Sequence, residues 1–266
     1  MSLITLFSAP KPFTDPRIAL IQNNAISSWT RLRDVEVLLM GEERGLEEAA
    51  ERHGVAHIRG VQRNDSGTPL ISSMVRLARE RSRSEILCII NADMMVMADF
   101  VEAGERMVGL KKRFVLVSRR WDLDVQVPIQ FTDGWEERLR WAVREQGVLH
   151  RPAGSDFFLF PRMLYAELPP FAIGRAGWDN WMIYKARKEH WLVVDGTPSL
   201  TIVHQNHDYS YHPEGEKGVW QGQEAQRNYE LAGGWTHFCF ISDATHRLTP
   251  STVKRNLSFA LRQKEN

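Results

Sequence analysis

Short apolar segments alternate with segments of helical periodicity over the first ninety residues, and this order restricts the fold more than any other feature of the chain. The apolar segments have the length and β-branched content of buried strands, and they lie at residues 3–8, 35–40, 55–61 and 86–90. Helical patterns bounded by Pro or Gly separate them, at residues 15–29, 46–53 and 68–81. This order predicts an α/β fold with a mainly parallel central sheet and helices on both faces.

The second half of the chain is less regular. Its apolar segments predict strands at residues 114–118, 157–160, 191–194, 200–204 and 238–241. Helical patterns lie at residues 135–145 and 179–188, and a last one begins at Thr249-Pro250. Residues 205–235 are rich in Gly, His and Tyr, and we expect a long loop there with a short helix near residues 221–231.

Composition excludes several classes of protein. The chain has 266 residues, and its formal net charge of +1 gives no field that favours nucleic acid. No apolar segment approaches the roughly 20 residues that a membrane-spanning helix needs. The N-terminal residues lack the basic region of a signal peptide, and one of the two cysteines, Cys88, lies in a predicted buried strand. We therefore expect a soluble protein in a reducing compartment, the cytoplasm.

A short polar segment, Asn91-Ala92-Asp93, directly follows the apolar strand at residues 86–90. Ligands of open α/β sheets bind beyond the carboxyl ends of the strands, so both polar side chains are placed where chemistry is expected. A divalent cation bound to a diphosphate needs oxygen ligands, and the carboxylate of Asp93 supplies one. A plain polar turn is the alternative interpretation.

A second cluster, Gly177-Trp178-Asp179, lies at the expected start of a helix. Asp179 could cap that helix, but an exposed pair of flanking tryptophans beside a carboxylate also suits a polyhydroxyl substrate. Asp156 precedes the apolar segment at residues 157–160. Its carboxylate could accept a hydrogen bond from a substrate hydroxyl or could simply end a turn.

A third cluster has two histidines, His204 and His207, at and just after the end of an apolar strand. Imidazole nitrogen is a common metal ligand, and a solvated loop is the alternative interpretation. The segment Trp121-Asp122-Leu123-Asp124 contains two further carboxylates. The neighbouring Arg119 and Arg120 indicate salt bridges there.

The order of these clusters resembles that of the nucleotide-sugar glycosyltransferases of the GT-A fold. In that family a loop after the first strand contacts the nucleotide, here Ser8-Ala9-Pro10, and the fourth strand ends in an Asp-x-Asp-type motif, here Asn91-Ala92-Asp93. A Gly/Trp-rich acidic motif follows, here Gly177-Trp178-Asp179, and a His-bearing strand end comes about 25 residues later, here His204. The resemblance covers most of residues 3–210 and implies a single GT-A-like, Rossmann-like domain.

The resemblance implies a nucleotide and metal site. Asp93 would bind both the metal and the diphosphate, and Asn91 would meet the ribose or the sugar, with Ala92 between them. His204 or His207 would complete the ligand shell of Mn²⁺ or Mg²⁺. This chain departs from the family in having Asn91 at a position where the family usually has Asp.

The resemblance also implies the residues that act on the acceptor. Asp179 would take the proton from the acceptor hydroxyl in an inverting transfer, while Trp178 and Asp156 would help to seat the sugar and the acceptor. Several relatives have two carboxylates in the acidic motif, whereas this chain has one. A retaining mechanism, in which Asp179 only positions the substrate, therefore stays open.

Taken together, the resemblance implies a transferase that moves a sugar from a UDP- or GDP-sugar to a hydroxyl of a sugar or glycan acceptor. We expect a catalytic domain at residues 1–246, with a nucleotide-binding half at 1–110 and an acceptor half at 111–246. Residues 247–266 are expected to form a basic helix that could make weak peripheral contact with a membrane.

Two alternatives to a transferase stay open. A sugar-1-phosphate nucleotidylyltransferase shares a similar sheet, but it needs a Gly-rich phosphate loop after the first strand, and residues 8–12 contain no glycine. A non-catalytic nucleotide-sugar-binding module is favoured by the substitution at Asn91.

Overall fold

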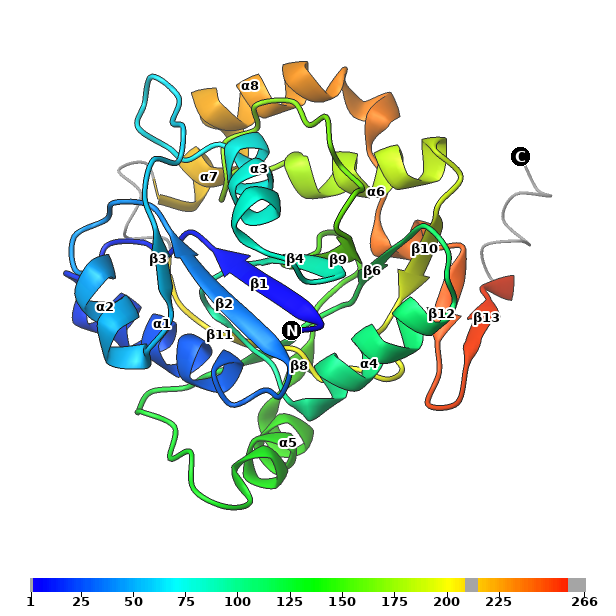
Figure 1. Ribbon diagram of the computed structural model, residues 1–266. Coiled ribbons are helices and arrows are strands. Elements are labelled where there is room, and N and C mark those ends of the chain that lie inside the picture. The colour runs from blue at the N-terminus through cyan, green and yellow to red at the C-terminus, as the bar shows by residue number, and fades with distance from the viewer. Residues whose placement is uncertain (1, 209–214, 258–266) are drawn as a thin grey trace.

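A large sheet forms the centre of the computed structural model, which describes residues 2–208 and 215–257 (Figure 1). Its strands are β1 (Ile4–Ser8), β2 (Val35–Met40), β3 (Ala56–Ile58), β4 (Ile86–Ile90), β6 (Phe114–Val117), β9 (Phe157–Pro161), β10 (Leu192–Asp195), β12 (His246–Leu248) and β13 (Val253–Arg255). Their order across the sheet is β13-β12-β10-β6-β9-β4-β1-β2-β3. Most neighbours are parallel, while β9 runs antiparallel to β4 and β6 and β13 runs antiparallel to β12. The mainly parallel sheet expected from the sequence is confirmed.

Helices cover both faces of this sheet (Figure 1). On one face, α3 (Ile71–Arg81), α6 (Trp178–Lys188) and α8 (Gln223–Ala232) pack with Leu87 and Ile89 of β4. On the other face, α1 (Pro16–Trp29), α2 (Leu46–His53) and α4 (Ala98–Gly109) pack with Ile86, Cys88 and Ile90. Successive side chains of a strand point to opposite faces, so the uninterrupted apolar sequence of β4 is that of a strand buried on both sides.

Local signals set the ends of the first two helices. The carboxylate of Asp15 accepts a hydrogen bond from the backbone N–H of Ile18 at 2.9 Å, and Pro16 is the first residue of α1. Helix α2 ends at Gly54, whose φ of 63° lies in the left-handed region that glycine adopts without strain.

The path of the chain across the sheet reverses at β1. This strand pairs in parallel with β2 on one side and with β4 on the other, so that Phe7 has both Leu38 and Ile89 as register partners. The chain leaves β1 toward one edge of the sheet and leaves β4 toward the other edge, and this arrangement opens a crevice beyond the carboxyl ends of the strands. Ser8, at the end of β1, and Asn91, just after β4, lie at that end.

A second, smaller sheet lies beside the crevice. Its strands are β5 (Met94–Met95), β7 (Trp121–Leu123), β8 (Val148–Leu149) and β11 (Val203–Gln205), in the order β5-β11-β7-β8. Within it, His204 has Met94 as its antiparallel partner and Asp122 as its parallel partner. Helix α5 (Trp135–Gln146) packs against this sheet through Leu139 and Val143. The small sheet therefore joins segments that are far apart in the sequence.

Two expectations for the last part of the chain are wrong. Residues 238–241 are not a strand. They join the 3-10 turn η1 (Trp235–His237) to the 3-10 turn η2 (Ile241–Asp243), and the carboxylate of Asp243 accepts a hydrogen bond from the backbone N–H of Phe240 at 2.9 Å. Thr249-Pro250 do not begin a helix, because the hydroxyl of Thr249 bonds to Thr252 and closes the turn between β12 and β13. The remainder of the expected basic helix, residues 258–266, lies outside the described residues.

Other elements differ in extent. Helix α4 was not among the expected elements, and the loop expected at residues 205–235 contains α7 (Gly215–Gln221) as well as α8. Residues 209–214 of that loop lie outside the described part of the chain. Across the described ranges, none of the helices combines the length and the apolar character needed to cross a membrane.

Candidate functional site

One cavity at the carboxyl ends of β1 and β4 contains all the residues that the sequence singled out as a site. Its volume is about 1280 Å³. The expected residues that line it are Ser8, Ala9, Pro10, Asn91, Ala92, Asp93, Asp156, Trp178, Asp179, His204 and His207. These residues come from both halves of the chain, so the fold brings the expected clusters together around a single volume.

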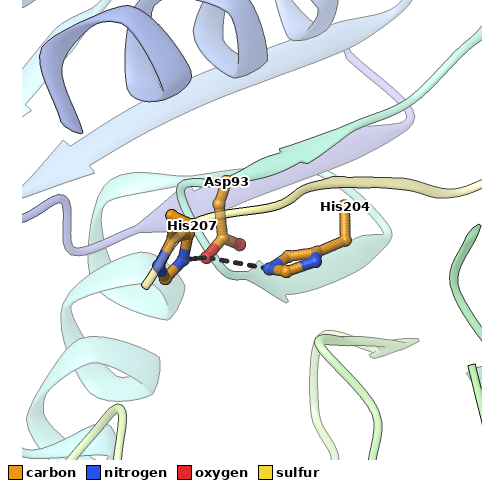
Figure 2. Close-up of side chains that lie close together, drawn as sticks. All are labelled: Asp93, His204 and His207. Atoms are coloured by element: carbon orange, nitrogen blue, oxygen red, sulfur yellow. Dashed lines mark hydrogen bonds and ion pairs between the residues drawn. The ribbon is translucent and has the colours of Figure 1, made fainter. Parts of the chain in front are cut away.

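Asp93, His204 and His207 face one another in this cavity (Figure 2). Oδ2 of Asp93 lies 3.0 Å from Nε2 of His207 and 3.8 Å from Nε2 of His204. One ligand atom from each of the three residues lies within 4.8 Å of the other two. Carboxylate oxygen and imidazole nitrogen at such separations are a suitable donor set for a divalent cation.

Hydrogen bonds on the far side of each imidazole direct its Nε2 toward Asp93. Nδ1 of His204 bonds to Oδ1 of Asp122 at 2.9 Å, and Nδ1 of His207 bonds to the backbone carbonyl of Asp208 at 2.7 Å. A carboxylate and a carbonyl only accept, so both Nδ1 atoms carry a proton. The Nε2 atoms, which face Asp93, are then the metal-binding positions, and at His207 a bound cation would take the place of the hydrogen bond between Nε2 and Asp93.

Asp93 itself fits a cation ligand. Its Oδ1 is buried and has no hydrogen-bond partner among the described residues. Burial alone raises the pKa of Asp93, but the hydrogen bond from His207 and the charges of His204 and Lys11 bring it well below its ordinary value. An ionised carboxylate with an unpartnered buried oxygen is suited to a positive ligand, and we conclude that the three residues fit a divalent metal ion.

Asn91 is tied to Asp156 rather than to a metal. Its side-chain amide donates to Oδ1 of Asp156 at 2.9 Å, and its backbone N–H donates to the carbonyl of Asp156, also at 2.9 Å. Oδ2 of Asp156 accepts from Arg120 at 2.8 Å. Asp156 is therefore a partner of two side chains in the cavity wall and not only the end of a turn.

Asp179 lies in the first turn of α6, whose N-cap position is Gly177 with a φ of 102°. Asp179 is therefore not the N-cap residue, and its Oδ2 accepts a hydrogen bond from the backbone N–H of Ser155 at 3.3 Å. Burial, together with the negative charge of Asp156, raises the pKa of Asp179 to about 6. A carboxyl group with such a pKa can accept a proton near neutral pH.

Trp178 is not the exposed aromatic residue that the sequence suggested. It is only 4% exposed, and its ring packs 5.4 Å from that of Phe158 in the core between α6 and the sheet. Trp181 is partly buried against Phe171. The expected exposed pair is therefore wrong, because the helix turns both rings toward apolar neighbours. The exposed tryptophan on the cavity is Trp220, on α7.

Several polar residues of the site were not recognised as such in the sequence. Lys11, Arg120 and His150 line the cavity, and Asp122 contacts the last two and His204 from behind. Burial lowers the pKa of the Lys11 ammonium to about 8, while the neighbouring Asp93 acts in the opposite direction. The salt bridge expected between Asp122 and Arg120 is present, at 2.9 Å. Lys11 was detectable only by its position after β1.

No protein-family model matches the chain, and no curated protein does. Solved structures match its fold. The TarS fragment 1–349 from S. aureus, in complex with UDP-GlcNAc, aligns with a TM-score of 0.53 and 10% identity over 87% of this chain and 64% of that one. Glucosyl-3-phosphoglycerate synthase from M. tuberculosis, in complex with Mg²⁺ and UDP, aligns with a TM-score of 0.51 and 15% identity over 88% of this chain and 80% of that one.

The chain has a GT-A fold. The same M. tuberculosis synthase in complex with phosphoglyceric acid aligns with a TM-score of 0.52 and 15% identity, covering 88% of this chain and 81% of that one. The chain spans 64% of the length of the TarS fragment. The GT-A fold expected from the sequence is thus confirmed.

Proposed function

We propose that the protein transfers a sugar from a nucleoside diphosphate sugar to an acceptor hydroxyl. The observation that carries this proposal is the shared cavity of a GT-A fold, in which an Asp–His–His cluster and a carboxyl group of raised pKa line the same volume. A cation site and a base are the two groups that such a transfer needs, one for the leaving diphosphate and one for the acceptor proton. A UDP-sugar is the first donor to test, because TarS is solved with UDP-GlcNAc and the M. tuberculosis synthase with UDP.

Asp93, His204 and His207 would hold the cation, Mn²⁺ or Mg²⁺. A bound divalent cation supplies positive charge that neutralises the leaving diphosphate. Lys11, whose side chain lies in the same part of the cavity, adds a further positive charge for the diphosphate when it is protonated. Ser8, Ala9 and Pro10 would contact the nucleotide, as expected from the sequence. Their position at and just after the end of β1, on the cavity, supports this role.

Asp179 would take the proton of the acceptor hydroxyl as that oxygen attacks the anomeric carbon. Its ionised form is available at neutral pH, and its raised pKa makes it a stronger base than an exposed carboxylate. Such a direct attack inverts the anomeric configuration. Asp156 and Asn91 hold each other in the wall of the cavity that Asp93 and Asp179 also line, where the sugar would be seated.

The domain division carries over as a proposal with one refinement. Residues 1–110 supply the nucleotide contacts and Asp93, and residues 111–246 supply Asp179 and the acceptor side, but the second half also supplies both histidines of the cation cluster.

The thiols of Cys88 and Cys239 are free, which supports the cytoplasmic location expected from the sequence.

Donor binding is tested first by thermal shift with UDP, GDP, CDP and their sugars, each with and without Mn²⁺. A ligand that binds only the folded state raises the melting temperature, so we expect stabilisation by one nucleotide series, and larger stabilisation with Mn²⁺. Transfer or slow hydrolysis of the stabilising donor is then measured with the wild-type protein and with Asp179→Asn.

The outcomes separate the candidate functions. Binding of a nucleotide sugar without hydrolysis or transfer to any acceptor tested would indicate a binding module instead. Release of diphosphate from a nucleoside triphosphate and a sugar phosphate would indicate a nucleotidylyltransferase. Full activity in excess chelator would remove the cation from the proposal.

A further inference from the structure

Asp122 accepts hydrogen bonds from two imidazoles at once. Oδ1 accepts from Nδ1 of His204 at 2.9 Å, and Oδ2 accepts from Nδ1 of His150 at 2.8 Å. Oδ1 also accepts from Nε of Arg120 at 2.9 Å. Three donors therefore converge on the two oxygens of one carboxylate. A side-chain amide of the same size has only one accepting oxygen and could not accept all three hydrogen bonds.

The strands of the small sheet fix this arrangement. Asp122 on β7 is the register partner of His204 on β11, and it is also the partner of Val148 on β8, two residues before His150. Arg120 is held in turn by Asp156 at 2.8 Å. The carboxylate is thus positioned by backbone pairing on both sides and by a second ion pair, and its side chain is 20% exposed.

We propose that Asp122 is a positioning residue that keeps the proton of His204 on Nδ1 and so presents the lone pair of Nε2 to a divalent cation beside Asp93. The proposal rests on the cation site of the proposed function. It adds that Asp122, which does not touch the cation, sets the tautomer of His204 before the cation binds. A neutral imidazole carries one proton, and the hydrogen bond made by one ring nitrogen decides which nitrogen is free to bind metal.

Substitution by Asn tests the need for an acceptor-only group. An amide has one accepting oxygen, so in Asp122→Asn either His204 or His150 faces an N–H₂ group. We expect the affinity for Mn²⁺, measured by titration of the free ion signal in electron paramagnetic resonance without any nucleotide, to fall about 10–100-fold. Asp124→Asn is the matched control, because Asp124 lies in the same segment, is 62% exposed, and contacts Arg17 at 3.6 Å and Gln126 but no histidine. Its affinity should equal that of the wild type.

A second measurement uses the unsubstituted protein and does not depend on how a variant folds. In the metal-free protein labelled with ¹⁵N-histidine, the two-bond proton–nitrogen correlations of His204 should show the Nδ1–H tautomer at a pH where the ring is neutral. The signals are assigned by their loss in His204→Gln. On addition of Zn²⁺, used as a diamagnetic probe, the Nε2 resonance of His204 should shift while Nδ1 stays protonated.

The results distinguish this inference from the proposed function. If the wild type binds Mn²⁺ and Asp122→Asn binds it equally well, or if His204 has the Nε2–H tautomer, the role of Asp122 is overturned and the cation site stands. If the wild type does not bind Mn²⁺, the role of Asp122 and the cation site are both overturned, while sugar transfer is judged by the donor and activity assays. A 10-fold or larger loss in Asp122→Asn together with the Nδ1–H tautomer supports the proposal.

Discussion

The side-chain amide of Asn91 donates a hydrogen bond to Oδ1 of Asp156 across 2.9 Å, and the second oxygen of Asp156 accepts from Arg120. The two carboxylate oxygens are thus both occupied by donors. A carboxylate in place of Asn91 would have no proton to donate and would bring a second negative charge against Asp156. The departure of this chain from the usual acidic residue therefore has a local reason.

Asn91→Asp should therefore damage the site although it introduces the acidic residue of the Asp-x-Asp-type motif that the chain resembles. We expect a loss of about 1–3 kcal/mol in the free energy of unfolding at pH 8, because the partly buried carboxylate of Asp156 loses a donor and faces a like charge. Denaturant titration measures this loss. The exchange variant Asn91→Asp/Asp156→Asn restores a donor–acceptor pair and should recover part of the stability; equal stabilities of the wild type and the single variant would contradict the explanation.

Asp179→Asn should reduce transfer and raise stability at the same time. Loss of a general base lowers kcat by about 10²–10⁴-fold. Because the folded-state pKa of Asp179 is raised from 3.8 to about 6, the wild type loses stability as the pH rises from 4 to 6, and the loss is complete above 6. The amide avoids this cost, so at pH 8 the variant should be more stable by up to about 3 kcal/mol, and the difference should vanish near pH 4. Chemical unfolding at the two pH values measures it.

The pH dependence of the wild-type reaction should show an acid limb with a midpoint near 6. Asp179 must be ionised to take a proton, and its pKa of about 6 determines where kcat/KM falls on acidification of the free enzyme. Cation affinity is measured over the same range, which separates protonation of Asp179 from loss of the histidine ligands. A midpoint near 4, the value of an exposed carboxyl group, would contradict the assignment of Asp179 as base.

Gly154→Ala should lower activity by displacing Asp179. A methyl group at residue 154 would lie 2.7 Å from Oδ2 of Asp179, closer than a carbon and an oxygen can approach, so the carboxylate must move. We expect at least a tenfold fall in kcat with the donor KM little changed, since small displacements of a reacting group can cost about 100-fold. Gly109→Ala on α4 is the control, because a methyl group there meets nothing within 4 Å. Equal activity in the two variants would contradict the prediction.

The first half of the fold was predictable because its strands are buried on both faces. Such strands have continuous apolar sequences, as at β4, and the helices between them begin or end at signals such as Asp15-Pro16 and Gly54. The strands of the small sheet have two or three residues each, and only pairing with distant segments makes them strands. Helix α4 did have a readable pattern, with Phe100, Val101, Gly104 and Met107 buried at helical spacing.

The candidate site was predictable where it follows from strand ends and not where it follows from pairing. Asp93 and His204 come directly after or at the end of apolar strands, and the fold places them together. Asp122 was noticed only for its salt bridge to Arg120, because its contact with His204 depends on the register of β7 and β11. The environment of Trp178 was mistaken because sequence alone does not show which face of α6 packs on the sheet.

The small sheet also bears on when the site can exist during synthesis of the chain. Asp93 leaves the ribosome more than one hundred residues before His204 and His207, and β11 must still pair between β5 and β7 to bring them together. A nascent chain therefore has the first four strands and Ser8 available long before it can hold a cation. The ability to bind a cation is in this sense acquired late, and its appearance reports that the two halves of the chain have joined.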